Sequence, residues 1–250
     1  MKKRRDAIVE LVNREGSVSF SQLRELFPTV SDMTLRTDLK SLDAERRLIR
    51  VHGGARSVEH AIGTDGLLGS RSRRNVDAKR LVATKALKLI RPDTTLFLDS
   101  GSTTMTLAGL LSDMRLIVFT NSISCVMELS RLEHTQVIVP GGRLNNYSMS
   151  LNGSSATQAI RRLSFDQLFL GVTAYSPETG FTCGSDEEAA LKQACIEQAA
   201  QTIVLMDSSK VGHRSTFSIC DLNDIDILIC DDQVSDDLRQ RCHAAGVQVL

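Results

Sequence analysis

The chain has 250 residues, enough for one large domain or for a small and a medium-sized one. Hydrophobic residues make up 42% and charged residues 24%, a globular composition that excludes a disordered or collagen-like chain. No apolar run approaches the roughly 20 residues of a membrane span, and no apolar stretch of the signal-peptide type follows the basic residues 1–5. We therefore expect a cytoplasmic protein with no membrane partner.

The net charge of zero hides two regions of opposite sign. Residues 1–80 carry 17 Lys and Arg against 11 Asp and Glu, a net charge of +6, so residues 81–250 carry −6. A basic head favours contact with phosphates, whereas an acidic body disfavours it. A chance fluctuation in surface charge is the alternative, so charge alone only suggests a nucleic-acid partner.

The N-terminal part shows the pattern of three short helices. Apolar residues recur at helical spacing within residues 3–14, and Ser19 or Ser21 is placed to cap a second helix. A third helix is predicted over residues 32–45, with Ser31 as its N-cap.

The third predicted helix has a polar, net basic face opposite its apolar stripe. That face carries Thr34, Arg36, Thr37 and Lys40. A helix with such a face fits the major groove of DNA, where its N-terminal half meets the base edges. We expect DNA contacts from these four residues and from Ser31. Residues 48–55 are predicted to form a strand and a glycine turn, the wing of a winged helix-turn-helix. From the wing we expect phosphate contacts by Arg50, His52, Gly53 and Gly54. The alternative is a three-helix protein-interaction module with a solvated polar face.

The rest of the chain indicates a linker and a second domain. We interpret residues 1–57 as the DNA-binding domain, residues 58–74 as a glycine-interrupted linker and residues 75–250 as an α/β domain. Short apolar strands alternate with helices in this last part, which predicts a mostly parallel sheet covered on both faces. The expected strands are 95–98, 116–119, 136–139, 167–170, 202–206, 227–230 and 246–249. The expected helices are 77–90, 104–111, 123–132, 154–163, 187–200 and 235–245.

Polar residues follow several of these strands, at the edge where parallel sheets bind ligands. The first strand runs into a hydroxyl-rich loop at the start of a helix, where free amides and the helix dipole attract an anion. Lys210 follows a later strand and can supply a positive charge to a phosphate. We expect a pocket for a phosphorylated, polyhydroxylated molecule, with helix capping alone as the alternative role of these residues. The predicted pocket residues are Asp99, Ser100, Gly101, Ser102, Thr103, Thr104, Asn121, Gly142, Gly171 and Lys210.

Enzymatic and metal chemistry have weaker support in the sequence. None of the six cysteines lies two residues from another, so zinc and redox motifs are absent, and we expect no metal and no cofactor. Asp99, Asp207 and Lys210 have the side chains that proton transfer on a sugar phosphate requires. A sugar-phosphate isomerase with an accessory DNA-binding head is therefore the alternative to a sensor, and turnover would distinguish the two.

Taken together, these blocks resemble the DeoR family of bacterial transcriptional regulators. The resemblance rests on residues 30–39, 50–55 and 99–104, and on the shorter motifs at 120–122, 141–142, 169–171 and 207–210. It implies a winged helix-turn-helix joined to a sensor domain with the fold of ribose-5-phosphate isomerase and glucosamine-6-phosphate deaminase. Family members usually repress carbohydrate-catabolic operons as homo-oligomers, here a dimer or a tetramer. They bind double-stranded operator DNA, and a phosphorylated sugar or related metabolite alters that binding.

The chain departs from the family pattern at two places that bear on specificity. The family commonly has two arginines in the recognition helix, whereas Thr37 follows Arg36 here, which changes the phosphate contacts or the bases that are recognised. After residues 171–172 the family tends toward a further glycine, and this chain has Thr173, Ala174 and Tyr175 instead. We expect Tyr175 to reshape one wall of the pocket.

Overall fold

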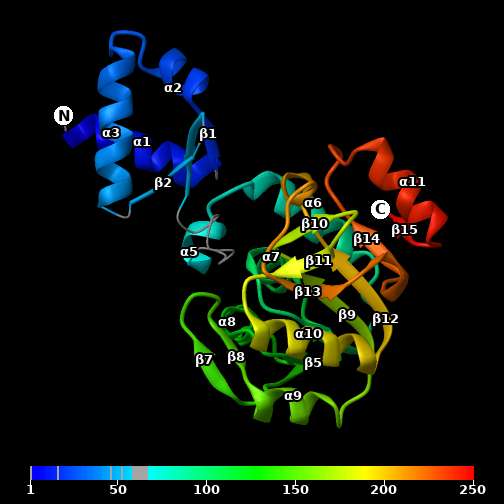
Figure 1. Cartoon of the computed structure of the whole chain (residues 1–250). Coiled ribbons are helices and arrows are strands. Elements are labelled where there is room, and N and C mark those ends of the chain that lie inside the picture. The colour runs from blue at the N-terminus through cyan, green and yellow to red at the C-terminus, as the bar shows by residue number, and fades with distance from the viewer. Residues whose placement is uncertain (1, 16, 46, 52, 58–66) are drawn as a thin grey trace. The chain divides into compact units, whose positions relative to one another are not determined.

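The computed structural model describes residues 2–15, 17–45, 47–51, 53–57 and 67–250. The chain divides into two compact units, Met1–Thr64 and Asp65–Leu250, here called the head and the body. Figure 1 shows helices and a small sheet in the head, and a larger sheet with helices in the body. The fold class predicted from the sequence, a helix-turn-helix followed by a mostly parallel α/β domain, is confirmed.

The head contains the three predicted helices and a small antiparallel sheet. The helices are α1 (Lys2–Glu15), α2 (Phe20–Leu26) and α3 (Asp32–Ala44). The strands β1 (Ser17–Ser19), β3 (Gly54–Arg56) and β2 (Ile49–Val51) lie side by side in that order. Ser19 begins α2 with a capping box, in which its hydroxyl accepts from the Gln22 amide and the Gln22 side chain accepts from the Ser19 amide. The core consists of Ile8, Leu11, Val12, Val18, Leu23, Leu35, Leu39, Leu42, Leu48 and Ala55.

A seven-stranded, fully parallel sheet forms the centre of the body. Its order is β15-β14-β12-β9-β4-β5-β6. The strands are β4 (Thr95–Leu98), β5 (Leu116–Thr120), β6 (Thr135–Ile138), β9 (Phe165–Gly171), β12 (Ala199–Leu205), β14 (Ile227–Ile229) and β15 (Gln248–Val249). Each lies where the sequence predicted a strand, with ends displaced by a few residues. The order proceeds in opposite directions from β4 and β9, so the sheet changes its winding direction between these two strands.

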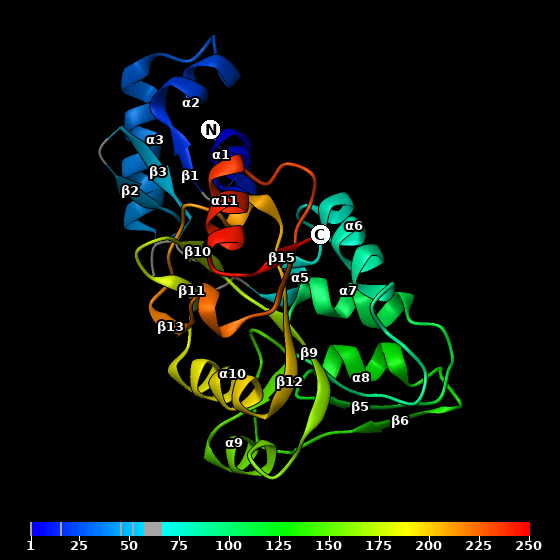
Figure 2. The same ribbon diagram turned by 90° about the vertical axis from the view of Figure 1, so that its right-hand side faces the viewer.

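Helices cover both faces of this sheet, as Figure 2 shows. One apolar core contains residues of α6 (Val76–Leu87), α7 (Ser102–Leu110) and α8 (Ile123–Leu129). The core on the other face contains residues of α9 (Ser154–Ile160), α10 (Asp186–Gln198) and α11 (Asp236–Ala244). All six predicted helices of the body are present. Among the described residues, every helix is too short or too polar to cross a membrane.

Several short elements of the body have no counterpart in the sequence prediction. They are the hairpin β7 (Arg143–Asn145) and β8 (Ser150–Asn152), the 3₁₀ turns η1 (Ser208–Lys210) and η2 (Leu222–Asp224), and a second sheet. That sheet is antiparallel and joins β10 (Ala174–Ser176), β11 (Gly180–Cys183) and β13 (Phe217–Cys220). Each element has only three or four residues, too few to show a periodic apolar pattern.

The second half of the predicted linker belongs to the body. Helix α5 (Leu68–Arg71) buries the Leu68 side chain, and the Leu68 amide donates to the Tyr147 carbonyl over 2.8 Å. The Lys79 ammonium donates to the carbonyls of Arg71 and Arg74 over 2.5 and 2.6 Å. Residues 67–74 are thus fixed by one apolar side chain and a buried lysine, whereas residues 58–66 of the predicted linker lie outside the described residues.

Candidate functional site

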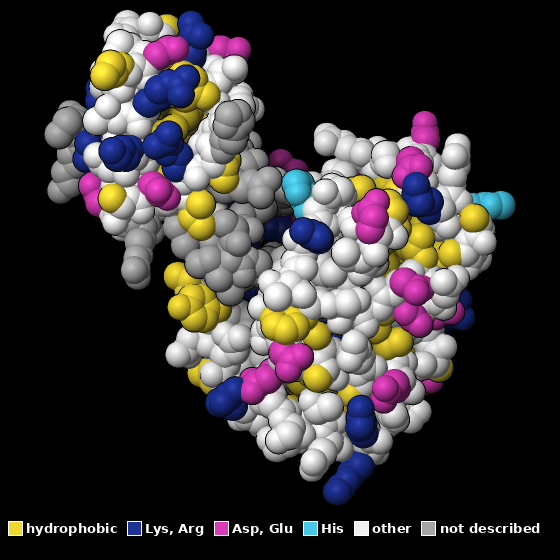
Figure 3. Space-filling model, viewed as in Figure 1, with side chains coloured by type: hydrophobic (Ala, Val, Ile, Leu, Met, Phe, Trp, Pro, Cys, Tyr) yellow, Lys and Arg dark blue, Asp and Glu magenta, His cyan; other side chains and the backbone are white. Residues whose placement is uncertain are grey.

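Helix α3 places the predicted DNA-binding side chains on one exposed face. Arg36, Thr37 and Lys40 are exposed, whereas Leu35, Leu39 and Leu42 are buried in the core of the head. Ser31 caps the helix by accepting from the Thr34 amide, and the two hydroxyl oxygens of Ser31 and Thr34 lie 2.8 Å apart. Figure 3 shows Lys and Arg side chains gathered on one face of the head.

Two contacts fix side chains on this face. The Arg36 guanidinium carbon lies 4.5 Å from the centroid of the Phe20 ring, a cation–π contact that holds the arginine against α2. The Thr37 hydroxyl donates to the Met33 carbonyl over 2.8 Å, so its hydrogen is used within the helix. Arg36 is therefore oriented by a neighbour, and Thr37 keeps only its oxygen lone pairs and its methyl group for DNA.

Part of the positive charge of the head serves the fold. Asp38, on the buried side of α3, accepts from Arg4 over 2.6 Å and from Arg5 over 2.9 Å. Burial would raise the pKa of the Asp38 carboxyl, but hydrogen bonds and charge from the two arginines outweigh burial and lower it. These ion pairs join α1 to α3, so Arg4 and Arg5 stabilise the position of α3.

The wing only partly matches its prediction. Arg50 is exposed, and its amide donates to Asp43 Oδ1 over 3.0 Å. Gly53 is exposed at φ +80°, a conformation that favours glycine. Gly54 is buried, and a Cβ there would lie 2.1 Å from the Val18 carbonyl oxygen. The expectation that Gly54 approaches a phosphate is therefore corrected, because this glycine allows β1 and β3 to pair; His52 lies outside the described residues.

A pocket opens in the body where the sheet changes its winding direction. It is a narrow depression that is partly open to solvent. The loop after β4 and the first residues of α7 contribute four lining residues, and the last residue of β9 and the loop after it contribute three. The two segments meet here because these neighbouring strands send their chains in opposite directions. The lining consists of Arg71, Ser100, Gly101, Ser102, Thr103, Gly171, Val172, Thr173, Glu188, Lys192 and Lys210.

The floor of the pocket contains a buried ion pair. The Lys192 ammonium donates to Asp99 Oδ2, to the Gly171 carbonyl over 2.9 Å, and lies 3.3 Å from Glu188 Oε1. The same Asp99 oxygen accepts from the Gly171 amide over 2.9 Å, so the pair connects β4, β9 and α10. Burial would lower the pKa of Lys192, but the carboxylates of Asp99 and Glu188 outweigh burial and raise it. Lys192 is therefore charged at neutral pH.

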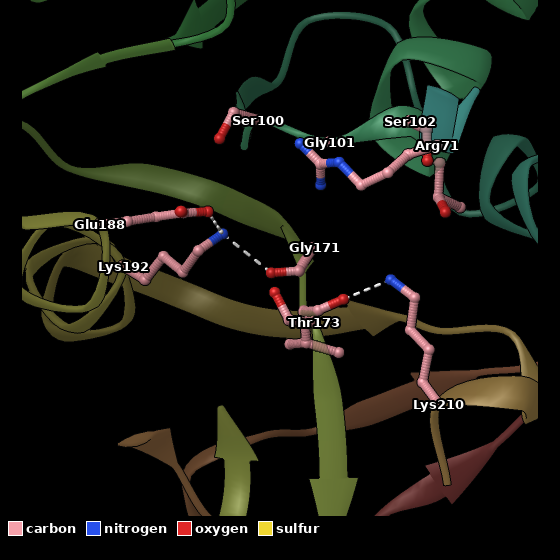
Figure 4. A pocket seen from close by; sticks show the side chains of 11 residues that line it. Arg71, Ser100, Gly101, Ser102, Gly171, Thr173, Glu188, Lys192 and Lys210 are labelled. Carbon is pink, nitrogen blue, oxygen red and sulfur yellow. Dashed lines mark hydrogen bonds and ion pairs between the residues drawn. The ribbon is translucent and has the colours of Figure 1, made fainter. Parts of the chain in front are cut away.

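Three cations from separate elements surround the pocket. Figure 4 shows Lys192, Lys210 and Arg71 entering it from different sides. Lys210 donates to the Val172 carbonyl, and Arg71 comes from α5 in the former linker. Helix α7 also borders the pocket with its N-terminus. Its N-cap residue, Gly101, has a φ of +153° and no side chain that could cap the amides of the first turn. Three cations and a helix N-terminus together fit an anionic ligand.

Some predicted pocket residues lie outside the lining. Asp99 and Thr104 are buried behind the loop, where the Thr104 hydroxyl donates to the Gly101 carbonyl over 3.0 Å. Asn121 is wholly buried, with its amide nitrogen 3.5 Å from both the Leu151 carbonyl and Asn152 Oδ1. A Cβ at Gly142 would lie 2.8 Å from the Asn152 carbonyl oxygen. The structure therefore gives Asn121 and Gly142 a place in the packing around β8, away from the pocket wall.

The expected effect of Tyr175 on the pocket is wrong. Its side chain is buried, and its ring centroid lies 4.8 Å from that of Phe181. Tyr175 thus packs between β10 and β11 in the core, whereas Thr173, two residues earlier, lines the pocket.

The sequence prediction also missed five residues of the pocket lining: Val172 and Thr173 directly follow the predicted Gly171, and the other three come from other elements. Glu188 and Lys192 are spaced four apart on α10, and Lys192 falls on the same helix face as the buried Ala189 and Cys195. A lysine within an apolar stripe, four residues after a glutamate, indicates a buried ion pair, and this pattern could have predicted Lys192 and Glu188. Nothing in the sequence around Arg71 indicated more than a basic residue in a linker.

Metal and thiol chemistry have no structural support within the described ranges. These contain no group of three or more His, Cys, Asp or Glu side chains that could hold a metal ion. Burial raises the pKa of the Cys125 and Cys242 thiols to about 11, so both are protonated and unreactive at neutral pH.

Two protein-family models match the chain, one in each unit. The DeoR-like helix-turn-helix domain matches residues 4–61, and the DeoR C-terminal sensor domain matches residues 74–232. The HTH-type transcriptional regulator GlpR of Haloferax volcanii is 33% identical over 99% of this chain and 96% of its own. The lactose phosphotransferase system repressor of Staphylococcus epidermidis is 30% identical over 91% of each chain. Ribose 5-phosphate isomerase A from Methanocaldococcus jannaschii aligns over 55% of each chain with 18% identity and a TM-score of 0.41.

A helix-turn-helix head on an α/β sensor body defines a DNA-binding transcriptional regulator. The chain belongs to the DeoR family of transcriptional regulators, a family of DNA-binding regulators and not of enzymes.

Proposed function

We propose that this regulator represses a carbohydrate-catabolic operon and that a phosphorylated sugar or related metabolite in the pocket alters its DNA binding. The observation that carries the proposal is the pocket itself, in which Arg71, Lys192 and Lys210 surround the N-terminus of α7. Hydroxyl groups of Ser100, Ser102 and Thr103 lie beside these cations and suit a polyhydroxylated ligand. The S. epidermidis relative is a lactose phosphotransferase system repressor, and its similarity to this chain supports the same assignment.

In this proposal the head contacts both the bases and the phosphates of operator DNA. Base recognition falls to Thr34, Arg36 and Thr37, which occupy the first half of α3. Phosphate contacts fall to Lys40 and to the wing, with Arg50, His52 and Gly53 as its members. A homo-oligomer, a dimer or a tetramer, would present two heads to the two half-sites of an operator.

The effector acts through the difference in its affinity for the DNA-bound and the free state. A coupling free energy of about 1–3 kcal/mol changes operator affinity by about 5–150-fold. Arg71 belongs to α5, the first described element of the body in sequence. A ligand that moves Arg71 would therefore act on the part of the body that is nearest to the head along the chain.

The proposal is tested by screening phosphorylated sugars for thermal stabilisation of the full chain. A ligand that raises the melting temperature is then titrated into a gel-shift assay with operator DNA. We expect Lys210→Ala to abolish both responses while leaving DNA binding intact, because it removes one of the three pocket cations. Lys88→Ala, which removes an exposed lysine of the same unit outside the pocket, is the control and should respond like the wild type. An unchanged effector response in Lys210→Ala would remove Lys210 from the ligand site.

A further inference from the structure

An apolar side chain stands on the polar face of the recognition helix. Met33 is 80% exposed, the most exposed of the large hydrophobic side chains that the structure describes. It is the second residue of α3, in the turn that enters the major groove first. Exposure of this apolar area to water is unfavourable in free energy, and burying it against a binding partner would be favourable.

Met33 belongs to the same stripe as the predicted base-contacting residues. Residues 33, 36, 37 and 40 are spaced at i, i+3, i+4 and i+7, so their side chains share one side of the helix. All four are exposed. A helix that presents Arg36 and Thr37 to base edges therefore presents Met33 to them as well.

Thr37 extends the apolar spot around Met33. Its hydroxyl donates to the Met33 carbonyl one turn earlier, which places these two residues next to each other on the helix surface. Because the hydroxyl hydrogen is bound within the helix, the Thr37 methyl group is an apolar contact available beside the Met33 thioether. The Arg36 guanidinium carbon lies 4.5 Å from the centroid of the Phe20 ring. This contact with α2 fixes the position of the positive charge beside Met33 and Thr37.

Only one apolar group lies on the base edges of the major groove, the C5-methyl group of thymine. We propose that Met33, together with the Thr37 methyl, contacts a thymine methyl and makes the regulator select a T·A base pair at that position of each half-site. This inference rests on α3 being the recognition helix, as proposed above. It assigns part of the sequence specificity to a side chain that makes no hydrogen bond to a base.

The test begins with duplexes that the wild-type full chain selects from a randomised DNA library. In the selected consensus, each thymine is replaced in turn by uracil, which removes only the methyl group. We expect one position per half-site at which uracil weakens wild-type binding about fourfold, the effect of losing one buried methyl group. Met33→Ala should bind the thymine and uracil duplexes equally at that position, and Met33→Leu should keep the preference for thymine.

Leu26→Ala provides the matched control, because Leu26 is also an exposed apolar residue of the head, 56% exposed, but lies at the end of α2. It should show the wild-type uracil pattern. If Met33→Ala also shows the wild-type pattern, or if no uracil substitution weakens the wild type, the Met33 assignment is overturned. Arg36→Ala separates this failure from a wrong recognition helix: undiminished consensus binding by Arg36→Ala would reject α3 itself, whereas weakened binding leaves only Met33 in question.

Discussion

Lys192 is the residue on which the wall of the pocket depends most. Its ammonium lies fully inside the body, where a charge is tolerated only with close partners of opposite sign. Asp99 and Glu188 supply that charge, and the Gly171 carbonyl supplies a further acceptor. The network therefore fixes the positions of the β4 loop, the β9 loop and α10 relative to one another around the ligand site.

We expect Lys192→Met to lower the free energy of unfolding by about 3–5 kcal/mol, because it leaves the buried Asp99 carboxylate without its cation. Urea denaturation at pH 7, followed by circular dichroism, measures the loss. Adding Asp99→Asn to this variant should recover part of it, since one unpaired charge disappears. Lys88→Met, on the exposed surface, should change stability by less than about 0.5 kcal/mol. Equal stability of the two methionine variants would contradict the structural role of Lys192.

Lys79 gives stability a specific dependence on pH. Burial lowers its pKa to about 8, with a further lowering by the nearby charge of Lys210. In the unfolded chain the same group titrates near 10.4, so between about pH 8 and pH 10 the unfolded state binds more protons than the folded state. The burial penalty of the charged lysine is therefore present below pH 8 and is relieved as the pH rises.

Because the unfolded state binds more protons in this range, the free energy of unfolding should rise with pH. We expect its value for the wild type, measured relative to Lys79→Met, to rise by about 2 kcal/mol between pH 7 and pH 9.5. Urea unfolding of both proteins at each pH measures the difference, and comparison with the variant cancels groups that titrate in both. A constant difference, or one that falls with pH, would show that the pKa of Lys79 is not lowered.

At the level of elements, the wing depends on a close approach of two strands. Gly54 pairs with Ser19 across these two strands. A Cβ atom at Gly54 would lie 2.1 Å from the Val18 carbonyl oxygen, so no larger residue fits without moving the strands apart. Gly53, next to it, has open space but a left-handed backbone.

We expect Gly54→Ala to separate β1 from β3 and to destabilise the head more than Gly53→Ala, for which left-handed strain costs about 1–2 kcal/mol. Thermal unfolding followed by circular dichroism compares the two variants in the full chain. If Gly54→Ala were as stable as the wild type, the tight contact between β1 and β3 would be wrong.

The elements also show how far the sequence determines the fold. Helices with buried stripes, such as α3, and apolar strands, such as β12, were predicted because their patterns extend over enough residues to reveal a period. The hairpin of β7 and β8 and the sheet of β10, β11 and β13 were missed because tertiary pairing, rather than local periodicity, defines such short strands. Likewise, the loop at residues 100–103 was predicted to form the pocket from its position after a strand. Lys192 and Arg71 were not, because they reach the pocket from elements distant in sequence.

At the scale of the whole molecule, each unit has an apolar core of its own. The core of the head draws its buried members from residues 8–55, and the two cores of the body draw theirs from residues 82–247. Charge follows this division only in part: the first 80 residues carry +6, but residues 65–80, which contribute +3 of it, belong to the body. The head uses Arg4 and Arg5 in ion pairs with Asp38, so its surface charge for DNA comes from fewer cations than the count suggests.

Because the cores are separate, we expect residues 67–250 to fold alone and to melt at the temperature of the body in the full chain. Differential scanning calorimetry of both proteins makes the comparison, with far-ultraviolet circular dichroism as the measure of folding. Loss of the folded state on removal of the head would show that the body requires it.

The hydrogen bonds from Lys79 to the carbonyls of Arg71 and Arg74 also bear on how such regulators exchange domains by recombination. Residues 68–79 contain both Arg71 of the pocket wall and Lys79, so a junction within them would break the ligand site of the recipient. A junction before Leu67 leaves that wall intact. New pairings of an operator with a metabolite are therefore most readily created by crossovers upstream of Leu67, which keep Arg71 and Lys79 together with the body.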